Sequence, residues 1–345
     1  LAIGLLLVFL RPLYIAPAAA LLQGSASLQL PEAETYLHYS FLGAPAALLL
    51  YVLNGWLIGV QRMKLVMSVS ILCNLLNIFF SFLLAFPADL GVGGLALGTA
   101  LAQYCAVGLL VLGAVRSQGR ILRHFRRDLL WHPPTLLRYF HVGKYLLIRT
   151  LLLQAVTLSF IRYGGLIGVT TLAANSLLMQ LFTLFSYFMD GLAYAAEALV
   201  GEAIGARAYR RLGDTVSLVL RTGAVTALTV SLLYLAIPHP FLTLLTDKEE
   251  VLRRALDYSY WMGAVPLVSF GAFLWDGILV GATDSKTMGL AMIFAALTFF
   301  LVAQLTLVPF GVHGLWLAFL SYLLVRSLLE HHWGTRRLRR YGREA

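Results

Sequence analysis

Long apolar segments recur along this chain and constrain its fold more than any other feature. A transmembrane helix needs about 20 consecutive apolar residues. Hydrophobic residues make up 60% of the 345 positions and charged residues only 12%, whereas a typical soluble domain carries about 25% charged residues. We therefore predict an all-α polytopic membrane protein. The expected spanning helices cover 41–60, 65–86, 92–115, 139–162, 171–199, 215–237, 256–282, 287–309 and 312–329.

The first ten residues are apolar but reach only about half-way across a bilayer, which predicts a partial helix and about ten helices in all. Residues 11–38, which contain Glu32 and Glu34, are predicted to form a loop.

The net charge of +10 comes from cations that gather in alternate loops and in the C-terminal tail. The richest clusters lie at 116–144, 207–211 and 336–343. Positive loops stay on the cytoplasmic side of a membrane. This distribution predicts a cytoplasmic C-terminus in the inner membrane. Aromatic residues do not interleave these cations in a binding pattern, which argues against a nucleic-acid partner.

An internal repeat divides the chain. The segment LLYVLNGWLIGVQRMK (49–64) aligns with GAFLWDGILVGATDSK (271–286), and GVGGLAL (91–97) aligns with GVHGLWL (311–317), each pair about 220 positions apart. Asn54 falls opposite Asp276. Two repeats of equal orientation are related by an axis along the membrane normal.

The repeat predicts two six-helix lobes with a pseudo-twofold axis along the membrane normal, the first lobe being incomplete by about 80 residues. The expected domains are a partial N-lobe (1–115), a basic cytoplasmic linker (116–138), a C-lobe (139–330) and a basic cytoplasmic tail (331–345).

Charged residues inside the apolar segments are the candidates for function. Asp190, Tyr194 and Glu197 follow at i, i+4 and i+7, so they share one face of a helix. Arg149 and Asp276 lie inside two further segments. Such groups line a water-filled path or bind an ion, or they form a structural ion pair between helices. Gln154 joins them as a polar neighbour.

The polar groups of the first half are neutral. Asn54, Asn74, Asn77 and Gln103 are expected to form hydrogen bonds between helices. The pairs Gly55/Gly59 and Gly277/Gly281 have the small-xxx-small spacing that permits close helix packing. The eight histidines show no metal-binding spacing, and no catalytic motif is present, so we expect neither a metal site nor an enzyme.

Four stretches together resemble the MATE (multidrug and toxic compound extrusion) transporters, in particular their DinF-like bacterial branch. They are LNGWLIGVQRMK (53–64), CNLLNIFF (73–80), MDGLAYAAEALVGEAIGA (189–206) and WDGILVGATDSK (275–286). The resemblance implies twelve helices in two lobes, and export of cationic or amphipathic small molecules driven by inward proton or sodium flow. No cofactor other than that coupling ion is expected.

The resemblance also implies roles for individual residues. Asp276 matches the tenth-helix carboxylate of cation coupling, and Asp190 and Glu197 match the acidic eighth-helix pattern of the DinF-like branch. Gln154 or a neighbour, with Arg149 nearby, stands at the seventh-helix acidic position of some sodium-coupled members. This departure favours protons over sodium.

Three other interpretations stay open at this point. A lipid-linked precursor flippase of the same superfamily would carry a cationic cavity, whereas the candidates here are mainly acidic. A membrane-embedded enzyme would need a cluster of nucleophile, base or metal ligands at one depth. A nonfunctional fragment is the third. The expected partners are a small-molecule substrate and the lipid bilayer, and the expected oligomeric state is a monomer.

Overall fold

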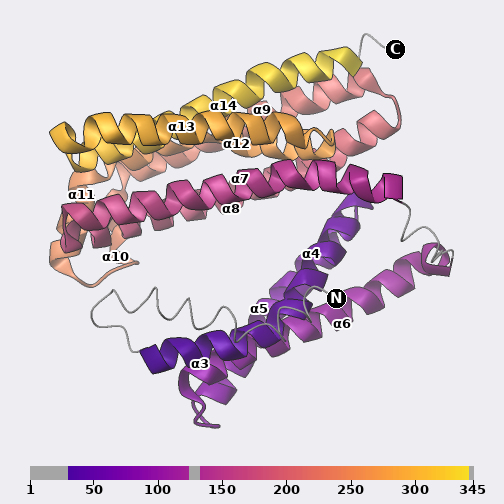
Figure 1. Cartoon of the computed structure of the whole chain (residues 1–345), viewed down its shortest axis with the longest axis horizontal. Helices are drawn as coiled ribbons and strands as arrows, with labels where there is room; N and C mark the ends of the chain where they lie inside the picture. The colour runs from indigo at the N-terminus through magenta and orange to yellow at the C-terminus, as the bar shows by residue number, and fades with distance from the viewer. Residues whose placement is uncertain (1–29, 124–132, 342–345) are drawn as a thin grey trace. The chain divides into compact units, whose positions relative to one another are not determined.

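A computed structural model describes residues 30–123 and 133–341 (Figure 1). The predicted partial helix at 1–10 lies outside the described residues. The chain separates into two compact units, 1–127 and 128–345. Every regular element in the described ranges is a helix.

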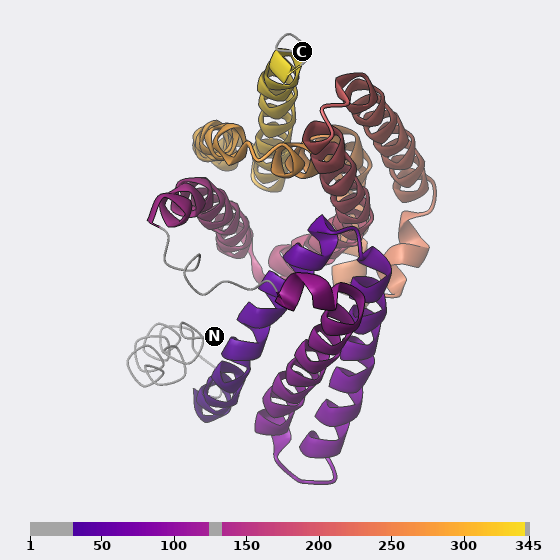
Figure 2. The same cartoon turned by 90° about the vertical axis from the view of Figure 1, so that its right-hand side faces the viewer.

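In residues 30–123, the described part of the first unit, the elements are four α-helices and a short 3-10 helix. Their bounds are α3 Leu30–Ser40, η1 Phe41–Gly43, α4 Ala44–Gly59, α5 Met63–Ala85 and α6 Gly91–Arg123. The prediction of a loop up to residue 38 is wrong for its last part, because α3 and α4 together form one apolar segment from Glu34 to Gly59. The helices α5 and α6 lie side by side (Figure 2). Their closest approach is at Gly94 and Gly98, which meet the backbone of α5.

The second unit is built around α12. Its helices are α7 Pro133–Ile167, α8 Val169–Gly205, α9 Tyr209–Ala236, α10 Pro238–Thr243, α11 Glu249–Tyr258, α12 Tyr260–Gly281, α13 Ser285–Phe310 and α14 Val312–Tyr341. The helix α12 packs against α8, α9 and α14, and α13 packs against α14 and α7. Long helices of this unit run alongside one another in Figure 1. The core is aromatic and aliphatic, with Trp275, Trp316, Phe160 and Phe185 fully buried.

Within the described residues, 9 helices are long and apolar enough to cross a membrane. The predicted multi-pass all-α class is therefore confirmed. The bounds differ most at the C-terminus, where the helix expected to end at 329 continues to Tyr341. One side of the added turns is covered by the protein, since Glu330 is fully buried and Gly334 lies against the Trp275 ring. The other side is exposed, as at His331, His332 and Arg336.

The repeat reappears in the local structure of each unit. The turn after α4 has Gln61 at φ 58°, and the turn after α12 has Thr283 at φ 54°. The same hydrogen bond closes both turns, from Arg62 N to Leu57 O and from Asp284 N to Leu279 O, each 2.8 Å long. This pattern is a Schellman motif. The duplicated sequence therefore encodes a duplicated backbone, while the axis relating the two lobes stays a prediction.

The helix contacts repeat as well. Gly94 at the start of α6 meets the backbone of Leu84 and Ala85, and Gly314 at the start of α14 meets that of Thr306 and Leu307. In each unit, the last helix therefore has a glycine near its start that packs against the backbone of the preceding helix.

Candidate functional site

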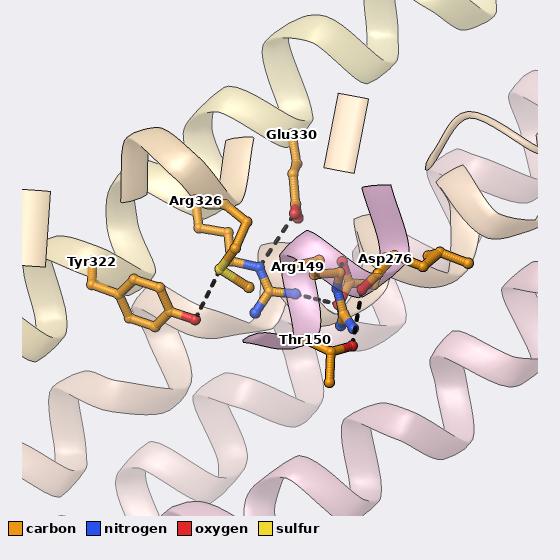
Figure 3. A network of polar contacts seen from close by, with 8 residues as sticks. Arg149, Thr150, Asp276, Tyr322, Arg326 and Glu330 are labelled. Carbon is orange, nitrogen blue, oxygen red and sulfur yellow. Dashed lines mark hydrogen bonds and ion pairs between the residues drawn. The ribbon is translucent and has the colours of Figure 1, made fainter. Parts of the chain in front are cut away.

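Three helices of the second unit bring charged side chains together at Asp276. The carboxylate comes from α12 and is only 8% exposed. Arg149 on α7 donates from Nε to Oδ1 over 3.3 Å and from Nη2 to Oδ2. Arg326 on α14 donates from Nη2 to the same Oδ2. Figure 3 shows both guanidinium groups directed at the one carboxylate. Asp276 is thus the point at which α7, α12 and α14 are tied electrostatically.

Glu330 extends this network along α14. It stands one turn after Arg326, whose Nε donates to Glu330 Oε1 over 3.2 Å (Figure 3). Glu330 is 0% exposed, and its second oxygen, Oε2, has no hydrogen-bond partner in the described part of the chain. The network of Arg149, Asp276, Arg326 and Glu330 contains two guanidinium and two carboxyl groups.

Neighbouring contacts hold the network helices in register. Gly277, next to Asp276, has no side chain, so the carbonyl of Ala193 on α8 can approach α12 closely. On the α14 side, the Trp275 indole donates from Nε1 to His331 Nδ1 over 3.2 Å. These contacts leave Asp276 little freedom to move away from its two arginine partners.

Asp190 lies at the edge of the network. It is half-buried on α8, and Asp276, Arg149 and Arg326 all act on it electrostatically. Among the described residues it forms no ion pair. The Asp190 carboxylate can therefore interact electrostatically with the network without forming an ion pair in it.

The other second-half candidates lie farther from the network. Glu197 is half-buried, and its backbone carbonyl meets Gly281 of α12. Tyr194 is exposed, and so is Gln154 on α7. The sequence thus grouped six residues of the second half, of which the structure places two in direct contact, Arg149 and Asp276. For these two the ion-pair alternative describes the observed arrangement.

The polar candidates of the first unit differ in their burial and in their contacts. Asn77 on α5 donates from Nδ2 to Thr99 Oγ1 on α6 over 2.7 Å, which is a hydrogen bond between helices. Gln103 packs at Gly43, whereas Asn74 is exposed. Asn54, the repeat partner of Asp276, has a buried Oδ1 with no partner in the described ranges. An amide therefore occupies the position that the second half gives to a paired carboxylate.

Sequence reasoning missed Arg326 and Glu330. The last helix was expected to stop at 329, which placed Glu330 at its edge and drew attention away from both residues. One signal was available, since a basic and an acidic residue four positions apart share a helix face. Arg326 lies inside the apolar segment, and the apolar residues Leu328 and Leu329 stand between it and Glu330. Among the described residues, no three His, Cys, Asp or Glu side chains are grouped closely enough to hold a metal ion.

Comparison with known proteins identifies the fold and the family. The MatE family profile matches residues 1–83 and 146–305. The chain is 33% identical over 340 residues to the DNA damage-inducible protein F of Escherichia coli, covering 96% of this chain and 72% of that protein. It is 28% identical over 324 residues to the probable multidrug resistance protein NorM of Rhizobium meliloti, covering 89% of this chain and 69% of that one.

A solved structure shares the fold. The crystal structure of MATE in the bent conformation superposes with a TM-score of 0.84 at 17% identity, covering 100% of this chain and 77% of that one. Together with the multi-pass helical fold, these matches confirm the predicted resemblance, including its DinF-like branch. They assign the chain to a transporter family rather than an enzyme family. The chain belongs to the MatE family of membrane transporters.

Proposed function

We propose that the protein is a secondary active antiporter of the cytoplasmic membrane that exports cationic or amphipathic small molecules in exchange for protons. The observation that carries this proposal is the buried ion network around Asp276. Charged groups inside a membrane segment cost about 2.5–3.5 kcal/mol each on insertion scales. Where such groups occur, they commonly mark ion or substrate pathways and proton relays.

The network has the properties of a switch. It links α7, α12 and α14 through ion pairs, so the strength of this link depends on which groups carry a proton. Desolvation favours the neutral form of a carboxyl group, whereas a nearby cation favours the ionised form. Alternating access would move the network between a paired, dry state and a solvated state. Proton binding and helix arrangement would then be coupled.

The geometry favours a proton over a sodium ion. Both oxygens of Asp276 accept from guanidinium groups. A sodium ion would need oxygen ligands and would meet the repulsion of two fixed cations. Because Arg149 and Arg326 are themselves paired with carboxyl groups, they offer no free cationic cavity of the kind expected for a lipid-linked precursor flippase.

The acidic face of α8 supports a cationic cargo. Asp190 and Glu197 are half-buried and form no ion pair in the described ranges. The exposed ring of Tyr194 stands between them and can stack on a cation or an aromatic compound. A monomer with its C-terminus in the cytoplasm completes the proposal.

Transport by the purified full-length protein tests it. Reconstituted liposomes would carry an imposed proton gradient or an imposed sodium gradient, and efflux of a cationic dye would be followed. We expect efflux with the proton gradient and none above empty liposomes with sodium alone. The proposal would be overturned if only the sodium gradient drove efflux, or if neither gradient raised efflux above that of empty liposomes.

A further inference from the structure

We infer that Glu330 is the group that takes up and releases the coupling proton, while Asp276 stays ionised as its electrostatic partner. This inference rests on the proposed proton-coupled antiport and assigns it to a residue outside the acidic candidates of the sequence.

Asp276 is poorly placed to accept a proton in this arrangement. It receives hydrogen bonds from two different guanidinium groups, and both of its oxygens are used. Neutralising Asp276 would leave the buried Arg326 and the half-buried Arg149 with Glu330 as the one carboxylate still in direct contact with either of them among the described residues. Removing one partner from a buried ion pair is strongly unfavourable, because the other charge stays uncompensated.

Glu330 has the opposite surroundings. It is fully buried, it receives one hydrogen bond, and its Oε2 has no partner in the described part of the chain. An ionised carboxylate is stabilised by hydrogen-bond donors to both of its oxygens. Burying a charge without such donors costs far more free energy than burying a neutral polar group without them. A neutral acid can keep the Arg326 hydrogen bond on Oε1 while its other oxygen carries the proton.

The charged groups facing Glu330 define what protonation changes. They are Arg326 on its own helix, Asp276 on α12 and Arg149 on α7. With Glu330 ionised, two guanidinium charges balance two carboxylates. With Glu330 protonated, the network carries one excess positive charge.

This one-unit change provides a reason for exchange. An excess positive charge beside Asp190 attracts the Asp190 carboxylate and repels a cationic cargo. Release of the proton from Glu330 removes that excess and leaves Asp190 available to a cation. The protonated and cargo-bound states therefore compete, which is the requirement for antiport. Arg326 transmits the change, because it contacts both Asp276 and Glu330.

Variants of the full-length protein test the inference. Glu330→Gln keeps an oxygen acceptor for Arg326 but cannot exchange a proton. Glu202→Gln is the matched control, since Glu202 pairs with Arg211 where both side chains are well exposed. Dye affinity would be measured as a function of pH in detergent, and proton-driven efflux in liposomes.

For the parental protein and Glu202→Gln, we expect dye affinity to rise as pH rises and a proton gradient to drive efflux. For Glu330→Gln, dye affinity should no longer depend on pH, and efflux should fall to that of empty liposomes. The infrared absorption of a protonated carboxyl group should be present in the parental protein and absent from Glu330→Gln. Glu330→Leu, whose side chain suits a fully buried site, carries the same expectations if the glutamine variant does not fold.

The outcomes separate the two levels of the proposal. If the parental protein shows no proton-driven efflux, the proposed function fails. If the parental protein is proton-driven but Glu330→Gln keeps pH-dependent affinity, parental efflux or the carboxyl absorption, the assignment to Glu330 is wrong while the antiport stands.

Discussion

Two guanidinium groups share one carboxylate at Asp276, and this sharing makes the residue an anchor of the C-lobe. An acid held by a single arginine can lose its partner when one helix moves. Asp276 keeps a partner on α14 when it separates from α7, and a partner on α7 when it separates from α14. The carboxylate can therefore stay compensated while the helices rearrange.

Asp276→Asn should destabilise the folded protein strongly. The amide is nearly the same size, but it leaves the charges of Arg149 and Arg326 against Glu330 alone. Breaking a buried ion pair by removing one partner costs about 3–5 kcal/mol. Thermal unfolding in detergent would show a lower midpoint for Asp276→Asn, with Asp214→Asn on the exposed part of α9 as an unchanged control. Equal midpoints for both variants would mean that the pairing contributes nothing to stability.

A compensating substitution sharpens this prediction. Residues in one charge network do not contribute additively. The double variant Asp276→Asn/Arg149→Gln removes one charge of each sign, so its unfolding midpoint should recover part of the loss. If the double variant lost more in unfolding midpoint than the two single variants lose together, the result would contradict the network.

The sequence indicated part of this site and could not indicate the rest. Arg149 and Asp276 stood out because charges inside apolar segments are costly wherever they fall. Which of the helices would meet them depended on tertiary packing, which helix periodicity does not contain. Arg326 and Glu330 escaped notice because hydropathy alone suggested that the last helix ended in water. The helix instead continues against Trp275, which keeps Glu330 dry.

At the scale of elements, non-glycine residues in left-handed conformation end three helices in the same way. Gln61, Arg207 and Thr283 have φ of 58°, 54° and 54° after α4, α8 and α12. L-residues other than glycine pay about 1–2 kcal/mol for this conformation. Each turn is nevertheless closed by a backbone bond from the following residue, at Arg62, Ala208 and Asp284. The geometry is thus imposed by the connections between helices.

Thr283→Gly should therefore stabilise the protein. Glycine adopts a positive φ without steric strain, and Thr283 is exposed, so little packing is lost. The gain expected is about 1 kcal/mol, read as a higher unfolding midpoint. Ala282→Gly is the matched control, because Ala282 has a right-handed conformation and is buried, and this change should lower the midpoint. A decrease for both variants would show that the threonine side chain matters more than the backbone.

Glycine-mediated packing of α12 on α8 was predictable from the spacing of small residues. A Cβ added at Gly277 or Gly281 would meet the backbone of α8, whereas a Cβ added at Gly55 or Gly59 would meet no atom of another element within 4 Å in the described part of the chain. The spacing alone could not distinguish these two pairs, since it says which residues permit close approach but not which partner is present.

Gly277→Ala should force α8 and α12 apart. Its new Cβ would overlap the Ala193 carbonyl, and overpacking of this kind costs about 1–3 kcal/mol. Gly191→Ala on α8 is the matched control, because nothing lies within 4 Å of the added carbon and alanine favours a helix by up to about 1 kcal/mol. Unfolding midpoints should move in opposite directions, and a shift of both in the same direction would contradict the packing argument.

At the scale of the whole molecule, hydropathy predicted the class because the bilayer imposes it. Backbone groups in lipid must be satisfied within each segment, which leaves a helix as the solution for long apolar runs. Each predicted spanning helix accordingly recurs, although α6 and α14 continue well past their expected ends, to Arg123 and Tyr341. Short helices in connections, such as α10 and α11, were not predicted, because no bilayer requirement acts on them.

The orientation can be tested directly on the whole chain. Cations in alternate connections predict that the C-terminus faces the cytoplasm. A fluorescent protein fused after residue 345 should fluoresce in cells, and alkaline phosphatase fused there should be inactive. An epitope inserted in the connection at 244–248 should be accessible from the opposite side. An active phosphatase at the C-terminus would reverse the assigned topology.

The duplicated turns and glycine contacts bear on how this protein evolved. Its two halves share the hydrogen bonds at Arg62 and Asp284 and the close approaches at Gly94 and Gly314. One half nevertheless has an amide at Asn54 where the other has an ionised acid. A duplication predicts this outcome, in which both copies keep the local architecture while their titratable residues differ. The first half thus shows the same local structure with a neutral residue, Asn54, at the position of Asp276.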